Sequence, residues 1–205
     1  MSRGRYALRV HAVEPLAAIP GGPVRYRAAQ ARIVAAALEL FAVHGVAGTS
    51  LQMIADAVGV TKAAVYHQFK TKDEIVLAAA EADMARLEAA LEAAEAEHGR
   101  PQARELLLVR LVDLAVDHRR MVSMLQSDPV MIRLLIEHEP FRRLMDRLHR
   151  LLAGDDPGDD GRVPVAMISA AIAGAVTHPL VADLDDETLR ANLLGLARRF
   201  LDLPD

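Results

Sequence analysis

The stretch LQMIADAVGVTKAAVYHQF, Leu51 to Phe69, decides the fold. It has the pattern of a helix-turn-helix, in which two short helices cross steeply and need a small residue at their contact, a place that Ala55 takes. Gly59 suits the tight turn, because glycine adopts a positive φ without steric cost. The expected core beneath the motif is Ile54, Val58, Val60 and Val65. The same spacing fits a helical hairpin inside a bundle, so spacing alone leaves two interpretations.

The distribution of charge along the chain bears on these two interpretations. The 205-residue chain has a formal net charge of -4, which as a single number argues against nucleic acid, because Lys and Arg supply the affinity for phosphates. Up to Lys72, however, nine basic residues stand against three acidic ones, and the remainder carries 15 basic and 25 acidic residues. Residues 1–72, the head, thus carry a net charge of +6, and residues 73–205 carry -10. Such a difference indicates that the first segment faces nucleic acid. All three lysines, Lys62, Lys70 and Lys72, lie in the head, and both phosphate contact and chance account for that.

Helical signals surround the motif. An apolar stripe predicts a helix over residues 26–44 that ends at Gly45. The two helices of the motif are expected at 50–58 and, capped by Thr61, at 61–69. Together these segments predict a three-helix unit.

A long fourth helix is predicted over residues 72–98. Thr71 and Glu74 have capping-box spacing at its start. Its apolar positions alternate in steps of three and four, at Leu77, Ala80, Met84, Leu87 and Leu91. A helix of about 26 residues is a rod of about 39 Å, long enough to enter two domains.

The rest of the chain predicts further helices and no strand, since no segment alternates with period two. The signals are Pro101, Asp128-Pro129 and Pro140 as helix starts, a loop at 154–162, Pro164 as the start of an Ala-rich helix to about His178, and Asp185 as the N-cap of a last helix to about Leu203. The predicted fold class is all-α.

From Arg27 to about Ala80 the chain resembles the TetR family of bacterial transcriptional regulators. The resemblance rests on ALELFAVHGVAGTS (37–50), IADAVGV (54–60) and VYHQFKTKDE (65–74). It implies a homodimer with an N-terminal three-helix DNA-binding domain and a C-terminal helical domain that holds a small ligand and the dimer interface. The expected organisation is an N-terminal arm (1–25), a helix-turn-helix domain (26–72) and an effector-binding and dimerisation domain (73–205).

Candidate DNA contacts gather at the starts of the second and third helices. Hydroxyl, amide and free backbone N–H groups at a helix start suit a phosphate, although Thr49 and Ser50 also qualify as simple caps. Lys62 is placed to donate to guanine O6 and N7, with alanine methyls against thymine methyls, and Lys72 resembles the family's phosphate-binding lysine. The candidate set is Thr49, Ser50, Gln52, Thr61, Lys62, Ala63, Ala64, Tyr66, His67 and Lys72.

The N-terminal arm shows no sustained period and contains several Pro and Gly residues. Arg3, Arg5 and Arg9 either reach into an adjacent minor groove or belong to an arm without fixed structure. Charged residues interrupt any signal-peptide hydrophobic region. No stretch reaches 18 uninterrupted apolar residues either, so the expectation is a cytoplasmic protein outside the membrane.

Methionine is frequent in the second domain, where six of the eight methionines lie after residue 80. Flexible thioethers adapt to irregular cavities, and few aromatic side chains accompany them. A small hydrophobic effector is therefore predicted, although ordinary core packing explains the same residues. The candidate lining is Met84, Leu87, Leu111, Met124, Met131, Leu135, Phe141 and Met167.

The last two helices offer surfaces for a homodimer. One has a small-residue face, and the other has an apolar stripe that packs either on a symmetry mate or within the subunit. These residues are Ala166, Ala170, Ala173 and Gly174 on the first, and Leu189, Leu193, Leu196, Phe200 and Leu201 on the second.

Motifs of catalysis and of metal or cofactor binding are absent from the sequence. It has no cysteine, no histidine pair with metal-site spacing, no GxSxG and no phosphate-binding glycine loop. The predicted function is a ligand-responsive regulator, a repressor that leaves a palindromic operator when a small hydrophobic effector binds. The alternative is an all-α enzyme or scaffold with an incidental helix-turn-helix.

Overall fold

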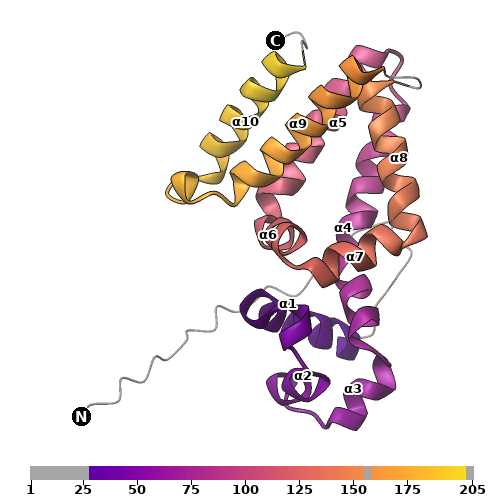
Figure 1. Ribbon diagram of the computed structural model, residues 1–205, viewed down its shortest axis with the longest axis vertical. Coiled ribbons are helices and arrows are strands. Elements are labelled where there is room, and N and C mark those ends of the chain that lie inside the picture. Colours follow the sequence, from indigo (N-terminus) through magenta and orange to yellow (C-terminus); the bar gives the residue numbers. More distant parts are fainter. Residues whose placement is uncertain (1–27, 155–157, 202–205) are drawn as a thin grey trace.

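The computed structural model describes residues 28–154 and 158–201, and within them the chain forms helices and no strand (Figure 1). The all-α prediction is confirmed, while the predicted arm lies outside the described residues. The elements are α1 (Ala28–Gly48), α2 (Leu51–Val58), α3 (Lys62–Gln68), α4 (Lys72–Glu95), α5 (Arg100–Asp117), α6 (Arg119–Ser127), α7 (Pro129–Glu137), α8 (Glu139–Ala153), α9 (Asp159–Val176), the short 3-10 helix η1 (Pro179–Val181) and α10 (Asp186–Phe200).

Helices α2 and α3 form one end of the molecule, below α1 in Figure 1. The side chains of Ser50 and Thr61 cap them by accepting backbone N–H groups three residues on. Gly59 makes the turn at φ 76°, and Ile54 and Val65 are fully buried beneath it. Val60 was expected in this core but is exposed, because it follows the left-handed turn and points outward.

Helix α1 bends at its predicted end. Gly45 has φ 69°, and one more helical turn follows from Val46 to Gly48. This conformation favours glycine, since a side chain there would be strained. The bend carries the chain from α1 into the cap of α2.

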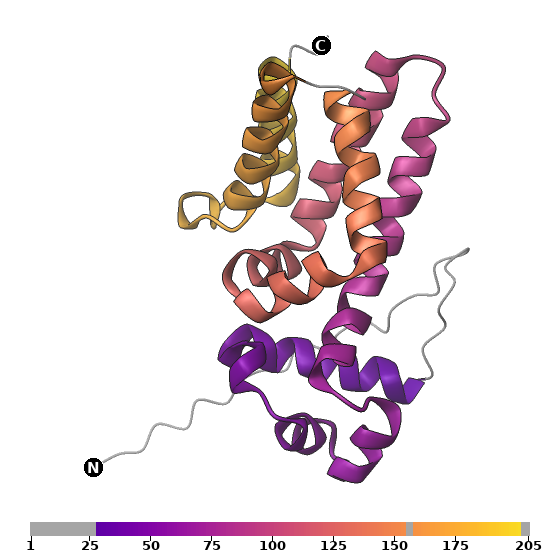
Figure 2. The same cartoon turned by 45° about the vertical axis from the view of Figure 1, so that its right-hand side comes forward.

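Helix α4 runs from the helix-turn-helix through the length of the body (Figures 1 and 2). Thr71 accepts the N–H of Glu74, as the capping box predicts, but the Glu74 carboxylate accepts the N–H of Lys70 at 2.7 Å, not that of Thr71. The acidic residues Asp73 and Glu74 in the first turn also suit the positive end of the helix dipole. The start of α4 is thus fixed to the end of α3.

The first hydrophobic cluster joins the helix-turn-helix to the body. Side chains of α1, α2 and α3 pack with the first half of α4 and with four buried residues of α6 and α7: Met121, Met124, Met131 and Leu135. The predicted boundary between residues 72 and 73 therefore falls at a helix start, but the apolar core continues across it. Motion of α6 or α7 must pass to α1 through this shared core.

Two further clusters hold the body. One joins α4, α5 and α8 with one residue of α9, and the other packs α9 and α10 against α5. Leu189, Leu193 and Leu201 of the α10 region lie inside the second of these, 7% exposed or less. The inward stripe of α10 is therefore core of its own subunit.

Two element boundaries differ from the prediction. The chain breaks at His118 between α5 and α6, although no proline or glycine marks the place. Helix α9 begins at Asp159, so Pro164 lies inside it and does not open it, and the predicted loop is shorter. Because Pro164 stands only five residues from the start, it removes a single hydrogen bond of the second turn.

Helix α1 is long and apolar enough to cross a membrane by length and composition. Ile33, Ala37, Phe41 and Val46 of this helix are buried against α2, α4, α6 and α7. These contacts account for the buried apolar side chains of α1, because a core helix needs the same residues as a membrane helix.

Candidate DNA interface and effector region

Two buried side chains, one within α3 and one directly after it, anchor this helix in the core, and its other side chains face solvent. Val65 and Phe69 are 0% and 5% exposed, which places Phe69 in the core. The predicted DNA-contacting residues of this segment are all exposed on one outer end of the molecule: Thr61, Lys62, Ala63, Ala64, Tyr66 and His67. A helix anchored on one face with small and basic residues on the other can enter a major groove.

Lys70 was not among the predicted DNA contacts, and the structure brings it to the same surface. Its ammonium lies 4.7 Å from the centroid of the exposed Tyr66 ring, a cation–π contact. The clustering of the three lysines is the sequence signal that points to it. Tyr66 and Lys70 therefore form one unit at the end of α3.

The start of α2 offers less to DNA than predicted. Ser50 is exposed but uses its hydroxyl oxygen as the cap for the N–H of Met53, 3.2 Å away. The Gln52 amide donates to Asp56 on its own helix at 2.7 Å. Thr49 is only 2% exposed, and its hydroxyl donates to the Gly45 carbonyl at 2.8 Å. The prediction that Thr49 contacts DNA is thus wrong for its side chain, which is buried and satisfied.

Lys72 also has an internal role. Its ammonium donates to the backbone carbonyls of Val46, Ala47 and Thr49, at 2.8, 3.3 and 2.6 Å. These are carbonyls at the end of α1 and before α2, where a cation is favourable. Since an ammonium has three donors, none remains for a phosphate in this arrangement. The predicted phosphate contact of Lys72 is replaced by a bond between α4 and the end of α1.

Lys72→Met is expected to destabilise the protein by about 1–2 kcal/mol, because three carbonyls lose a charged donor. Urea unfolding measures the change. Lys70→Met is the matched control and should change stability by no more than about 0.5 kcal/mol, since its ammonium is exposed. Unchanged stability in Lys72→Met together with weaker DNA binding would instead support the phosphate role.

The predicted effector-lining residues differ in burial. Met124, Met131 and Leu135 are buried in the first cluster. Met84, Leu87, Leu111 and Phe141 are half-buried. Met167 is 54% exposed on the outer side of α9, so its place in the lining is wrong. Helical periodicity predicted that these residues lie on apolar helix faces, but not which neighbouring helix covers each face.

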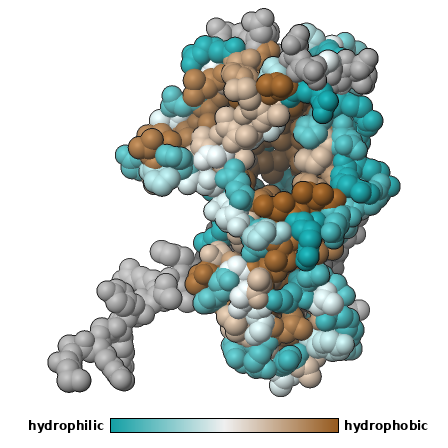
Figure 3. Space-filling view, viewed as in Figure 1, coloured by the Kyte–Doolittle hydropathy of each residue, from teal (hydrophilic) through white to brown (hydrophobic). Residues whose placement is uncertain are grey.

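The half-buried members lie in the middle of the body. Here every residue of α4 from Glu81 to Leu87 is neither buried nor fully exposed. Figure 3 shows the surface hollowed at this level, between α5 on one side and α4 and α8 on the other, above α7, with hydrophobic residues inside. At the same level, His118 Nδ1 lies 3.1 Å from Asp83, and Arg86 donates to the same carboxylate at 2.8 Å. Of the predicted lining residues, Met84 and Leu87 belong to this stretch of α4.

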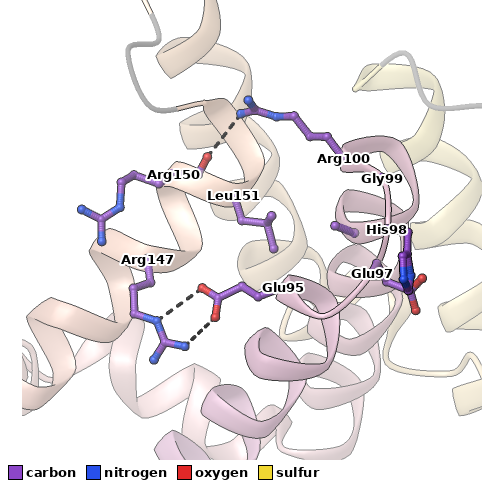
Figure 4. A pocket seen from close by; sticks show the side chains of 9 residues that line it. Glu95, Glu97, His98, Gly99, Arg100, Arg147, Arg150 and Leu151 are labelled. Carbon is purple, nitrogen blue, oxygen red and sulfur yellow. Dashed lines mark hydrogen bonds and ion pairs between the residues drawn. The ribbon is translucent and has the colours of Figure 1, made fainter.

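Two surface clefts are also present on the body. The first, about 410 Å³, lies between the α4–α5 turn and the end of α8, and is mostly polar (Figure 4). Arg147 pairs with Glu95 there at 2.7 Å, and Arg100 donates to the Arg150 carbonyl at 3.3 Å. The second, about 450 Å³, lies along α7 and α8 and includes Phe141, Met145 and His149. Among the predicted effector residues only Phe141 lines either cleft.

Comparison with known proteins identifies the type of the DNA-binding segment. The family model of bacterial regulatory proteins of the tetR family matches residues 33–79, which span the helix-turn-helix and the first third of α4. A transcriptional repressor of Corynebacterium diphtheriae, AcnR, is 28% identical over 176 residues, covering 78% of this chain and 90% of the relative. The helix-turn-helix segment of this chain is therefore of the TetR-family type, and the chain is a DNA-binding transcriptional regulator.

Solved structures of TetR-family proteins share the whole fold with this chain. A tetR-family regulatory protein of Rhodococcus RHA1 has a TM-score of 0.67 at 24% identity, covering 88% of this chain and all of the other. AibR, solved in complex with isovaleryl coenzyme A and operator DNA, has a TM-score of 0.60 at 19% identity, covering 82% and 97%. The similarity therefore extends from the helix-turn-helix through the helical body.

Helices α9 and α10 each leave apolar side chains exposed on their outer faces. Val163, Met167, Leu196 and Phe200 are 55%, 54%, 57% and 45% exposed, and Ala166 and Ala170 are exposed beside them on α9. The predicted stripe on α10 thus divides. Leu189, Leu193 and Leu201 face inward, and only Leu196 and Phe200 can meet a partner.

Proposed function

We propose that this protein is a cytoplasmic TetR-family repressor that binds a palindromic operator as a homodimer and leaves it when a small hydrophobic effector binds. The observation that carries the proposal is α3, which is anchored by Val65 and presents Thr61, Lys62, Ala63 and Ala64 outward. The proposal includes the division into a DNA-binding domain (26–72) and an effector-binding and dimerisation domain (73–205). It includes no enzymatic activity.

Base recognition is assigned to the first turn of α3. The Lys62 ammonium is exposed at the helix start, where it can reach guanine O6 and N7, and the methyls of Ala63 and Ala64 suit thymine. Tyr66, His67 and Lys70 follow at the edge, where phosphates run. Ser50 and the N–H groups at the start of α2 supply further phosphate contacts. Direct contacts of Thr49 and Lys72 side chains are not part of the proposal.

Two copies of α9 and α10 would form the dimer interface, as a four-helix arrangement built on Val163, Met167, Leu196 and Phe200. The exposed apolar side chains of both helices support this, because soluble monomers rarely leave large apolar patches uncovered. A twofold axis would place two α3 helices to read half-sites one turn apart, about 34–36 Å.

Effector binding is assigned to the hollow beside α4 and to the half-buried predicted residues Met84, Leu87 and Leu111 of α4 and α5. An apolar ligand there would bury these side chains and displace α4, which continues into the helix-turn-helix. A ligand shifts the equilibrium only as far as its affinities for the two states differ. The complex of AibR with isovaleryl coenzyme A makes acyl thioesters a sensible first probe.

The DNA-binding part of the proposal is tested by a gel shift with the DNA upstream of the protein's own gene. We expect a complex that weakens steeply with salt, because phosphate contacts release counterions. Random DNA of equal length is the control. Equal binding to both DNAs, or none to either, would contradict a specific operator and favour a scaffold or enzyme that carries the motif incidentally.

A saturating apolar effector is expected to raise the melting temperature by about 5–10 °C, as binding at one hundred times Kd adds about 2.7 kcal/mol. Decanoate and isovaleryl coenzyme A are suitable probes in a thermal-shift assay. Met84→Trp should fill the hollow and remove the shift, whereas Met167→Trp, on the exposed side of α9, should retain it. Failure of both probes in the unaltered protein would contradict the assigned effector class.

A further inference from the structure

Asp128 stands between α6 and α7 and is a nearly buried carboxylate, 9% exposed. As the N-cap of α7, its Oδ1 accepts the N–H groups of Val130 at 2.9 Å and Met131 at 3.1 Å. This is the capping role that the sequence predicts for an aspartate before a first-turn proline.

The second oxygen of Asp128 does not serve α7. Oδ2 accepts the N–H of Val46, in the last turn of α1, at 2.6 Å, across 82 residues of sequence. The close approach of Oδ2 to the backbone depends on Gly45. A Cβ at this position would lie 3.2 Å from Oδ2, and a residue with a side chain would be strained at φ 69°. The bend in α1 is thus shaped to receive this carboxylate.

The peptide groups at the bend are held from a second side by α4. The Val46 carbonyl accepts from Lys72 at 2.8 Å, while its N–H donates to Asp128. Val46 is therefore bonded both to the N-cap of α7 and to the first residue of α4. It stands four positions before Ser50, the N-cap of α2. A shift of either helix must move the start of the helix-turn-helix or break a buried hydrogen bond.

Helix α7 also borders the effector region. Its Met131 and Leu135 share a cluster with α1, and Met84 and Phe141 pack against that cluster. We propose that Asp128 is a positioning residue that transmits the state of the effector region from α7 to the bend of α1, as a second connection beside α4. The inference rests on the proposed function, in which an effector controls DNA binding.

Asp128→Asn separates the two roles of this carboxylate. The amide carbonyl of Asn still caps α7, but its NH₂ is a donor and cannot accept from Val46. Asp185→Asn is the matched control, because Asp185 caps α10 by accepting the N–H of Thr188 at 2.8 Å, far from α1. Asp128→Ser, a shorter cap, is a second variant should the Asn protein fold poorly.

Amide hydrogen exchange tests the connection itself, without DNA or effector. Relative to Ile54, the Val46 amide should exchange about tenfold faster or more in Asp128→Asn, as expected for loss of a charged acceptor. It should be unchanged in Asp185→Asn. Equal protection of Val46 in all three proteins would overturn the proposal.

Upstream DNA then serves as the probe of transmission. Binding of DNA should change exchange in α7 in the unaltered protein and in Asp185→Asn, and the change should be lost in Asp128→Asn and Asp128→Ser. A DNA complex in which α7 never responds, or responds equally in every variant, would refute transmission through Asp128. Absence of any DNA complex would instead refute the proposed function, and the Val46 amide would still decide whether the connection exists.

Discussion

A protein that carries Leu196→Asp together with Phe200→Asp is expected to be a folded monomer that binds the operator about a hundredfold more weakly or worse. Both side chains are about half exposed in the single chain, so the aspartates stay hydrated there. In the proposed dimer the four carboxylates would be buried against apolar side chains, at a cost that the interface cannot offset. Each freed subunit would then lose the gain from binding two linked half-sites.

Light scattering after gel filtration gives the oligomeric state, and fluorescence anisotropy gives the operator affinity. Ile136→Asp is the control, because Ile136 is as exposed as Leu196, at 57%, but lies on α7. Leu193 is unsuitable for this test, since it is 7% exposed in the core and its replacement by Asp would unfold the subunit. A double variant that remains dimeric would contradict the interface on α9 and α10.

The second large effect is expected for Lys62→Glu, which should weaken operator binding by about a hundredfold or more, because two recognition helices each lose a base contact worth about 1–3 kcal/mol. The carboxylates would also face phosphates. Stability should hardly change, as the side chain is exposed.

Arg110→Glu, the same charge reversal at an exposed side chain of α5, separates a local effect from the change in net charge. It should leave affinity within about threefold, because charges beyond a Debye length are screened. If Arg110→Glu weakens binding as much as Lys62→Glu does, the long-range field and not α3 governs the complex.

Local hydrogen bonds are the part of this structure that the sequence predicts well. Ser50, Thr61, Thr71, Asp128 and Asp185 each cap a helix by bonding to a backbone N–H two or three residues on. Such contacts depend only on residue type and spacing, and the helix starts follow from them. The family pattern in residues 54–74 has the same local character.

Long-range contacts account for the errors. Lys72 was predicted to face phosphate, but its three acceptors lie 23 to 26 residues earlier in the chain. The stripe of α10 was correctly seen as apolar, yet Leu193 faces α5 while Leu196 faces outward. Periodicity places side chains on a helix face, and only the packed structure decides what covers that face.

The bend at Gly45 and Val46 also bears on the design of hybrid regulators, in which one protein's DNA-reading head is joined to another's sensing body. A cut at residue 72 would carry the Val46 N–H into the hybrid without the carboxylate that accepts it. A C-terminal domain with Asp as the N-cap of its seventh helix would restore that bond. One with Ala at the same position would leave a buried donor unpaired. The exchangeable unit of this protein is therefore residues 28–72 together with position 128, two segments that are distant in sequence and must be transplanted as one.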